Sequence, residues 1–139
     1  MMKNRNLPHS DHWSTPDYFY NELDKEFHFD FDPCPLNHDV KTWDGLKIEW
    51  GDRCFCNPPY SIELKTKFIH KAIGESKKGS LVVMLLPVST STKLFHDIIK
   101  PNAKEIRFIK GRIKFCGYNS KGEYVTNKSP MHDSMIVIF

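Results

Sequence analysis

The run Leu81-Val82-Val83-Met84-Leu85-Leu86 is apolar without interruption, and Pro87 follows it directly. A strand with one face in water alternates apolar and polar side chains. An unbroken apolar run is instead typical of a strand covered on both faces, as in parallel sheets. Proline cannot continue a central strand because it lacks the backbone N–H. The run therefore predicts a buried, parallel strand over 81–86.

Predicted helices and strands alternate on both sides of this run. The spacing of apolar residues predicts, in chain order, a strand over 53–56, a helix over 62–76, a helix over 91–99 and a strand near 105–110. Such alternation is typical of an α/β fold with a mostly parallel sheet. Two later apolar segments, 113–116 and 134–139, are expected to pair as a C-terminal antiparallel hairpin.

The first part of the chain carries weaker signals. Residues 1–12 are polar and are expected to form a loose N-terminal segment. A hydroxyl residue before Pro16 and an acidic residue after it predict a helix over about 16–26. Residues 27–32 alternate Phe with polar residues, which predicts a strand that ends at Asp32.

The composition excludes several classes of protein. The 139 residues are 40% hydrophobic and 13% aromatic, which is too apolar for a disordered chain and enough for one domain. No apolar run approaches the ~20 residues of a membrane span, and Met1–Ser10 lacks the apolar core of a signal peptide. The four cysteines form no CxxC pair, so we expect a reduced, cytoplasmic protein. Cys34, His38, Cys54 and Cys56 lack the usual spacing of structural zinc ligands, so we expect no metal.

Charge is unevenly distributed along the chain, whose formal net charge is +3. Residues 1–57 carry 6 Lys and Arg against 11 Asp and Glu, a net charge of −5. Residues 58–100 and 101–139 each carry 7 against 3, a net charge of +4. This split suggests two partners, a cationic or hydroxyl-rich small ligand and a polyanion. An unevenly charged surface without a partner would give the same pattern.

The most specific motif is Asn57-Pro58-Pro59-Tyr60, directly after the strand predicted over 53–56. Proline has a fixed φ and no N–H, so the turn presents carbonyl oxygens in a preset geometry beside the Asn57 amide oxygen. Two such acceptors can hold one planar NH2 group, and Tyr60 offers an aromatic face to the ring that bears it. The alternative is a rigid turn whose Tyr60 only fills the core.

A second motif, Asp32-Pro33-Cys34, ends the strand predicted over 27–32. Ligands of parallel sheets bind outside the carboxyl ends of the strands. Because both motifs follow predicted strands, we expect them to form one site.

These motifs resemble those of the amino-group methyltransferases that use S-adenosylmethionine, and among them the small phage-type DNA N6-adenine methyltransferases. The resemblance covers residues 12–139, and the segments that carry it are Trp13-Ser14-Thr15-Pro16, Asp32-Pro33-Cys34, Asp44-Gly45-Leu46, Phe55-Cys56-Asn57-Pro58-Pro59-Tyr60-Ser61, Leu86-Pro87, Gly111-Arg112-Ile113-Lys114-Phe115 and Ser134–Phe139. It implies a single, compact Rossmann-like methyltransferase domain over 13–139, without a separate target-recognition domain. Only 24 residues separate Asp32 from Asn57, so some standard strands are expected to be shortened or absent.

The resemblance also implies an activity, methyl transfer from S-adenosylmethionine to N6 of an adenine flipped out of duplex DNA. The implied catalytic residues are Asn57, Pro58, Pro59 and Tyr60. The expected cofactor contacts are Thr15, Pro16, Asp32, Pro33, Cys34 and Asp44. Asp32 could instead cap the following turn with its side chain. The expected DNA contacts are Lys65, Lys67, Arg112, Lys114 and Lys121.

Two alternatives stay open. The same turn can hold other planar NH2 groups, such as cytosine N4 or a glutamine amide in a protein. A chain of this fold can also be a DNA-binding module without catalytic activity.

Overall fold

The computed structural model describes residues 13–35, 44–118, 121–128 and 132–139. The segment predicted to be loose, 1–12, lies outside the described residues.

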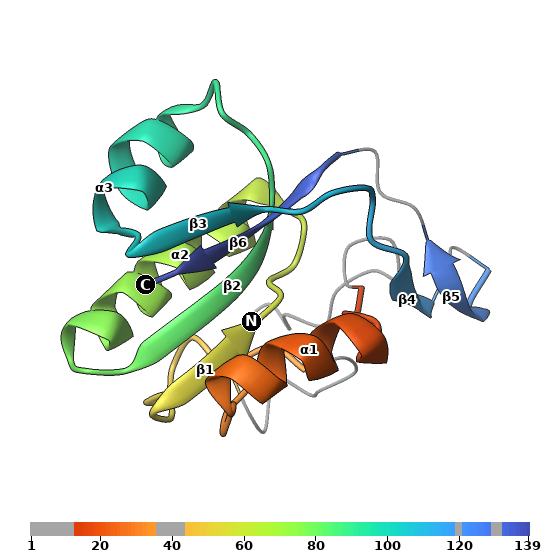
Figure 1. Ribbon diagram of the computed structural model, residues 1–139, viewed down its shortest axis with the longest axis horizontal. Coiled ribbons are helices and arrows are strands. Elements are labelled where there is room, and N and C mark those ends of the chain that lie inside the picture. The colour runs from red at the N-terminus through yellow and green to blue at the C-terminus, as the bar shows by residue number, and fades with distance from the viewer. Residues whose placement is uncertain (1–12, 36–43, 119–120, 129–131) are drawn as a thin grey trace, which may run out of the picture.

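A mixed, four-stranded sheet forms the centre of the molecule (Figure 1). Its strands are β1 (Arg53–Cys56), β2 (Leu81–Pro87), β3 (Glu105–Phe108) and β6 (Ser134–Ile138), in the spatial order β1-β2-β6-β3. β1 and β2 are parallel, and β6 is antiparallel to both of its neighbours. β1, β2 and β3 therefore run in one direction and β6 in the other. The predicted strands over 53–56, 81–86 and 105–110 are confirmed, but the sheet expected to be mostly parallel is mixed, with one parallel and two antiparallel pairs of neighbouring strands.

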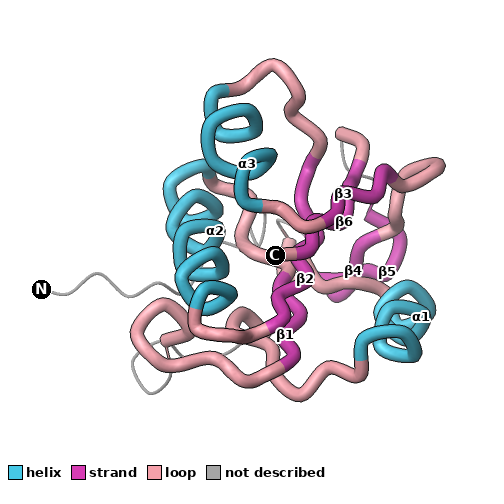
Figure 2. The backbone as a smooth tube through the Cα atoms, turned by 60° about the vertical axis from the view of Figure 1, so that its left-hand side comes forward, coloured by secondary structure: helices cyan, strands magenta, loops and turns pink. Residues whose placement is uncertain are grey.

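Helices cover both faces of this sheet (Figure 2). α2 (Ile62–Lys77) lies on one face, together with the π-helical turn η1 (Leu94–Ile99) and the short α3 (Lys100–Asn102). α1 (Asp17–Phe27) lies on the opposite face, close to the small sheet of β4 (Phe115–Tyr118) and β5 (Tyr124–Lys128). The helices predicted over 16–26 and 62–76 are thus present, and the helix predicted over 91–99 is present from Leu94 as the π-helical turn η1. The wide η1 turn precedes Pro101, whose ring cannot fit against the carbonyl four residues earlier.

The apolar run of β2 supplies side chains to two cores, as a strand covered on both faces must. Val82, Met84 and Leu86 pack with α2 and η1, whereas Val83 and Leu85 pack with α1 and β4. Because both faces of β2 are buried, this strand separates the core beneath α2 from the core beneath α1.

No helix in the described part of the chain is long and apolar enough to cross a membrane.

The expected pairing of 113–116 with 134–139 is wrong. β4 pairs with β5 in a separate two-stranded sheet, and β6 enters the main sheet between β2 and β3. Every residue of β6 is buried, which requires cover on both faces, whereas buried and half-buried residues alternate along β4. The segments 113–116 and 134–139 are both apolar in sequence. The sequence therefore does not show that one belongs to the small sheet and the other to the main sheet.

The strand expected over 27–32 is also wrong. α1 continues to Phe27, and His28 has a left-handed backbone with φ of 54°. The extended segment that follows contacts β1 through one parallel bridge, between Phe31 and Cys54. Phe29 packs in the core beneath α1, whereas Phe31 packs in the core beneath α2. In a regular strand the two would share one face, so the alternation reflects a twisted connection.

Candidate functional site

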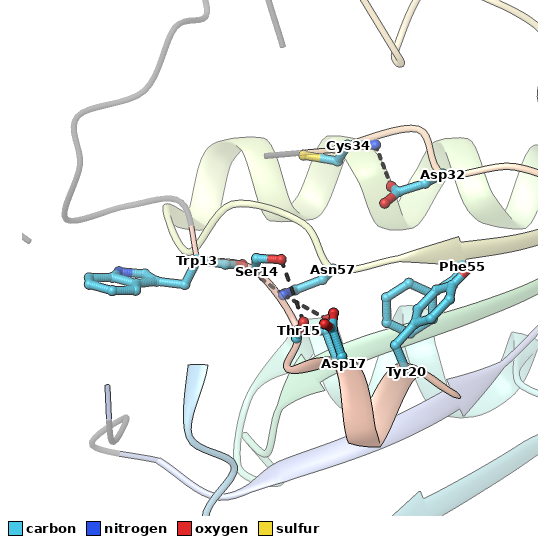
Figure 3. Close-up of a pocket in the computed structure, with 9 residues that line it drawn as sticks. All are labelled: Trp13, Ser14, Thr15, Asp17, Tyr20, Asp32, Cys34, Phe55 and Asn57. Atoms are coloured by element: carbon cyan, nitrogen blue, oxygen red, sulfur yellow. Dashed lines mark hydrogen bonds between the residues drawn. The ribbon is translucent and has the colours of Figure 1, made fainter. Parts of the chain in front are cut away.

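A cavity of about 150 Å³ opens where β1 ends (Figure 3). Its lining residues are Trp13, Ser14, Thr15, Asp17, Tyr20, Asp32, Cys34, Phe55 and Asn57. Phe31 pairs in parallel with Cys54, so Asp32 and Asn57 follow neighbouring extended segments and reach the same edge. The structure therefore brings the two predicted motifs together, at the carboxyl end of β1.

The orientation of the Asn57 amide is fixed by two acceptors. The residue is 7% exposed, and its Nδ2 donates to the Trp13 carbonyl at 2.8 Å and to the Thr15 hydroxyl at 3.2 Å. A backbone carbonyl can only accept, so the amide nitrogen must face it. The Asn57 oxygen, Oδ1, consequently points elsewhere, and no described residue donates to it.

The rest of the turn packs behind Asn57. Pro58 and Pro59 are buried, and Tyr60 is half-buried. The Tyr60 ring makes T-shaped contacts with Phe115, at 6.1 Å between centroids, and with His132, at 5.5 Å. Pro58, Pro59 and Tyr60 do not line the cavity, whereas Asn57 does.

Asp32 both caps a turn and lines the cavity. Its Oδ1 accepts the N–H of Cys34 at 2.8 Å, which is the capping role considered from the sequence. The residue is exposed to water, but it lies in a concave part of the surface beside the cavity. Desolvation there raises the pKa of Asp32 to about 6, and the hydrogen bond from Cys34 only partly opposes the rise. The carboxylate would therefore be stabilised by a cationic ligand.

The other expected cofactor contacts differ in position. Thr15 and Cys34 line the cavity and are buried. Pro33 is buried without lining it, and Pro16 is buried where α1 begins, with its carbonyl accepting two N–H groups of the first turn. Asp44 lies outside the cavity lining and accepts the N–H of Leu46 at 2.9 Å, so it caps a turn.

The sequence interpretation missed some residues of the cavity as site residues. They are Trp13, Ser14, Asp17, Tyr20 and Phe55. Asp17 and Tyr20 are three residues apart on α1, so they share a helix face beside Thr15. Phe55 is two residues before Asn57. The available signal was proximity in sequence, to Asn57 for Phe55 and to the expected contacts Thr15 and Pro16 for the other four residues.

The expected DNA contacts lie outside the cavity lining, on three segments. Lys65 and Lys67 belong to α2, Arg112 and Lys114 precede β4, and Lys121 lies between β4 and β5. Lys65 is half-buried, and desolvation lowers its pKa. Lys67 pairs with Glu63 at 3.2 Å, and Arg112 lies 3.7 Å from Asp133. Lys114 and Lys121 are exposed.

Cysteine and histidine do not form a metal site in the described ranges. Those residues contain no group of three His, Cys, Asp or Glu able to hold an ion. Cys34, Cys54 and Cys56 are free thiols, and His38 lies outside the described part of the chain.

A mixed sheet covered by helices, with a cavity at the carboxyl end of a parallel strand, is the arrangement in which α/β proteins bind their ligands. Comparison with known families is more specific. Residues 3–139 match the family model of the DNA N-6-adenine-methyltransferases (Dam), and the chain belongs to this family. The resemblance seen in the sequence motifs is thereby confirmed. No curated protein and no solved structure matches the chain.

Proposed function

We propose that the protein transfers the methyl group of S-adenosylmethionine to N6 of an adenine in duplex DNA. Family membership supports DNA adenine methylation as the activity. The observation that carries the residue-level proposal is the fixed orientation of Asn57, whose amide nitrogen is held by Trp13 and Thr15. An amide held in this way offers its oxygen, and an oxygen acceptor is what an exocyclic NH2 group requires.

In this proposal Asn57 Oδ1 and the Pro58 carbonyl each accept one N–H of the target amino group. Pro59 keeps the turn rigid because its φ is fixed. Two acceptors on the amino protons draw the nitrogen lone pair out of conjugation with the ring, so that it can attack a methyl group. The new N–C bond would form as the methyl carbon–sulfur bond of the sulfonium breaks, so that the neutral thioether S-adenosylhomocysteine is the leaving group, and one N6 proton leaves to water. Catalysis is mostly positioning, which supplies roughly 7–11 kcal/mol in well-oriented systems.

The cavity residues fit the proposed cofactor by their chemistry. S-adenosylmethionine bears positive charge on its sulfonium and ammonium groups and hydroxyls on its ribose, and when bound it supplies an electrophilic methyl group. The carboxylates of Asp32 and Asp17 line the cavity, and so do the rings of Tyr20 and Phe55. Carboxylates accept hydrogen bonds and stabilise cations, whereas aromatic faces pack against a flat base. We assign binding of the cofactor to these residues and to Cys34, which also lines the cavity.

The target adenine must leave the duplex to reach Asn57. Unpairing and unstacking cost a few kcal/mol, and stacking on an aromatic side chain offsets roughly 1–3 kcal/mol of this. Tyr60 is the aromatic residue of the turn and is assigned this role. The basic side chains on α2 and around β4 would hold the phosphates.

The test is mass spectrometry of nucleosides from duplex DNA incubated with the protein and S-adenosylmethionine. We expect N6-methyladenine from the parent. Asn57→Ala removes one acceptor and should slow methylation at least ~100-fold, the scale of one lost transition-state hydrogen bond. Asn102→Ala, at the exposed end of α3, is the matched control and should keep the parent rate. N4-methylcytosine as the sole product, or no methylated base, would overturn the proposal.

A further inference from the structure

We infer that Thr15 is a positioning residue, whose hydroxyl holds the Asn57 amide in the productive orientation that the Trp13 carbonyl selects. This inference rests on the proposed function of Asn57. The expectation from sequence placed Thr15 among the cofactor contacts. Thr15 lines the cavity, and its Oγ1 lies 3.2 Å from Nδ2 of Asn57.

The need for such a residue follows from the shape of an amide. Rotation by 180° exchanges the NH2 and the oxygen of Asn57 with almost no change in volume. In the rotated form an NH2 would face the NH2 of the target base, and the Asn57 oxygen would face the Trp13 carbonyl. Both contacts would be unfavourable. The Trp13 carbonyl can only accept, so it excludes this form, and the Thr15 hydroxyl then holds the amide nitrogen in the form that remains. Figure 3 shows both partners on the segment beside Asn57.

The segment that bears these acceptors is itself held at three points. The Trp13 side chain is 4% exposed and packs in the core beneath α1. The N–H and carbonyl of Ser14 pair with the carbonyl and N–H of Cys116 in β4, at 2.5 and 2.9 Å. Pro16 is buried directly before α1. The acceptors are therefore preorganised, and no reorganisation is needed when a base arrives.

The same pairing couples Asn57 to the small sheet. Cys116 belongs to β4, and the paired Ser14 lies between the two residues, Trp13 and Thr15, that hold Asn57. A displacement of β4 would move the Trp13 carbonyl and the Thr15 hydroxyl together. Correct placement of β4 is thus a condition for correct placement of the Asn57 oxygen.

Thr15→Val tests the hydroxyl, because valine has nearly the same shape and no oxygen. Its single-turnover methylation rate at saturating S-adenosylmethionine should fall roughly 5- to 10-fold, the equivalent of one neutral hydrogen bond. Cofactor affinity should stay within about twofold of the parent, since the hydroxyl is not assigned to the cofactor. Thr15→Ser keeps the oxygen and should restore the rate. Ser80→Ala removes a hydroxyl bonded at 2.8 Å to Gly51, before β2, and should leave the rate unchanged.

A second readout does not depend on activity. The side-chain NH2 signals of Asn57 in a 15N-labelled protein can be assigned by their loss in Asn57→Asp. In the parent both protons should be protected from exchange, and Thr15→Val should expose one of them. If the rate and the NH2 signals of Thr15→Val equal those of the parent, the inference is wrong. Weakened cofactor binding with unchanged NH2 signals would make Thr15 a cofactor contact instead. Because these signals are read without methylation, they decide the role of Thr15 even if the proposed function fails.

Discussion

The buried carboxylate of Glu75 accepts the backbone N–H of Trp50 at 2.5 Å, which ties α2 to the loop before β1. The Trp50 indole in turn donates to the Gly45 carbonyl at 2.7 Å. Gly45 lies so close to Pro33 that a Cβ atom there would be 1.9 Å from the Pro33 carbonyl oxygen. A continuous set of contacts thus runs from Glu75 to the turn that bears Asp32.

Removing the Glu75 carboxylate should destabilise the protein. Glu75→Ala leaves the buried Trp50 N–H without its acceptor, at a cost of about 1–3 kcal/mol. Glu75→Gln keeps an acceptor oxygen and should cost less. Urea unfolding of the two variants measures the difference. Equal stability of Glu75→Ala and the parent would show that the contact with Trp50 contributes nothing.

The stability that Glu75 contributes should also depend on pH. Burial would raise its pKa, but the Lys78 ammonium, the Trp50 N–H and Lys71 together hold the pKa below the ordinary value of 4.5. A lowered pKa means that the contribution is present above about pH 4.5 and is lost as pH falls through the folded-state value. Denaturation at a series of pH values measures this. Below about pH 4.5 the free energy of unfolding should fall less steeply with decreasing pH in Glu75→Gln than in the parent. The same fall in both proteins would show that Glu75 is not the source of the pH dependence.

Two glycines should respond to alanine in opposite ways. Gly45→Ala forces a methyl group against the Pro33 carbonyl, so we expect a loss of about 1–3 kcal/mol and weaker cofactor binding through displacement of the Asp32 turn. Gly74 is exposed in α2, and a Cβ atom added there would meet nothing within 4 Å, so Gly74→Ala should stabilise by roughly 0.5–1 kcal/mol. Thermal unfolding and calorimetric titration of both variants check the pair. Gly45→Ala with parental stability would refute the close approach.

The central part of the fold could be predicted because its local patterns agree with its environment. The run over 81–86 is apolar on both faces, and β2 is buried on both faces. Periodicity also located α1 and α2 to within one residue at each end. The pairing of strands could not be predicted, because an apolar segment is expected to be buried but its sequence does not indicate which strand it pairs with. The segment 134–139 therefore looked like half of a hairpin, although it enters the main sheet.

The candidate site was predictable at its two motifs and not between them. Asn57 and Asp32 carry polar groups directly after extended segments, which is a local signal. The bonds from Asn57 to Trp13 and Thr15 span 44 and 42 residues, and no local pattern encodes such a contact. The same holds for Glu75 and Trp50, which are 25 residues apart.

Cofactor affinity should fall in acid because of Asp32. A cationic ligand favours the ionised carboxylate, and the pKa of Asp32 is raised to about 6. Below about pH 6 binding must therefore displace a proton, and affinity should drop up to ~10-fold per pH unit. Asp32→Asn should bind weakly and lose most of this dependence on pH. Isothermal titration with S-adenosylmethionine tests this, and a flat profile in the parent would remove Asp32 from the cofactor contacts.

DNA affinity should decrease steeply with salt, because phosphate contacts release counterions. Lys121 lies between β4 and β5, so Lys121→Ala should reduce the slope of log K against log salt by about 1. Lys77, exposed at the far end of α2, is the control and should leave the slope unchanged when replaced by Ala. Fluorescence anisotropy on a labelled duplex at several salt concentrations measures both. Affinity without salt dependence in the parent would argue against DNA as the substrate.

The Tyr60 ring should matter more than its hydroxyl, because stacking on an extruded base needs only an aromatic face. Tyr60→Phe should methylate within a few-fold of the parent, and Tyr60→Ala should lose about 1–3 kcal/mol of binding to the extruded base. The ring also contacts Phe115 and His132, so Tyr60→Ala should lower stability as well. His132→Ala removes one of these ring contacts and leaves the Tyr60 ring in place, so it is the control for packing. We expect melting temperature and single-turnover rate to fall together in Tyr60→Ala, and His132→Ala to lower only the melting temperature. If the folded fraction of Tyr60→Ala methylates at the parental rate, Tyr60 fills the core and does not stack on the base.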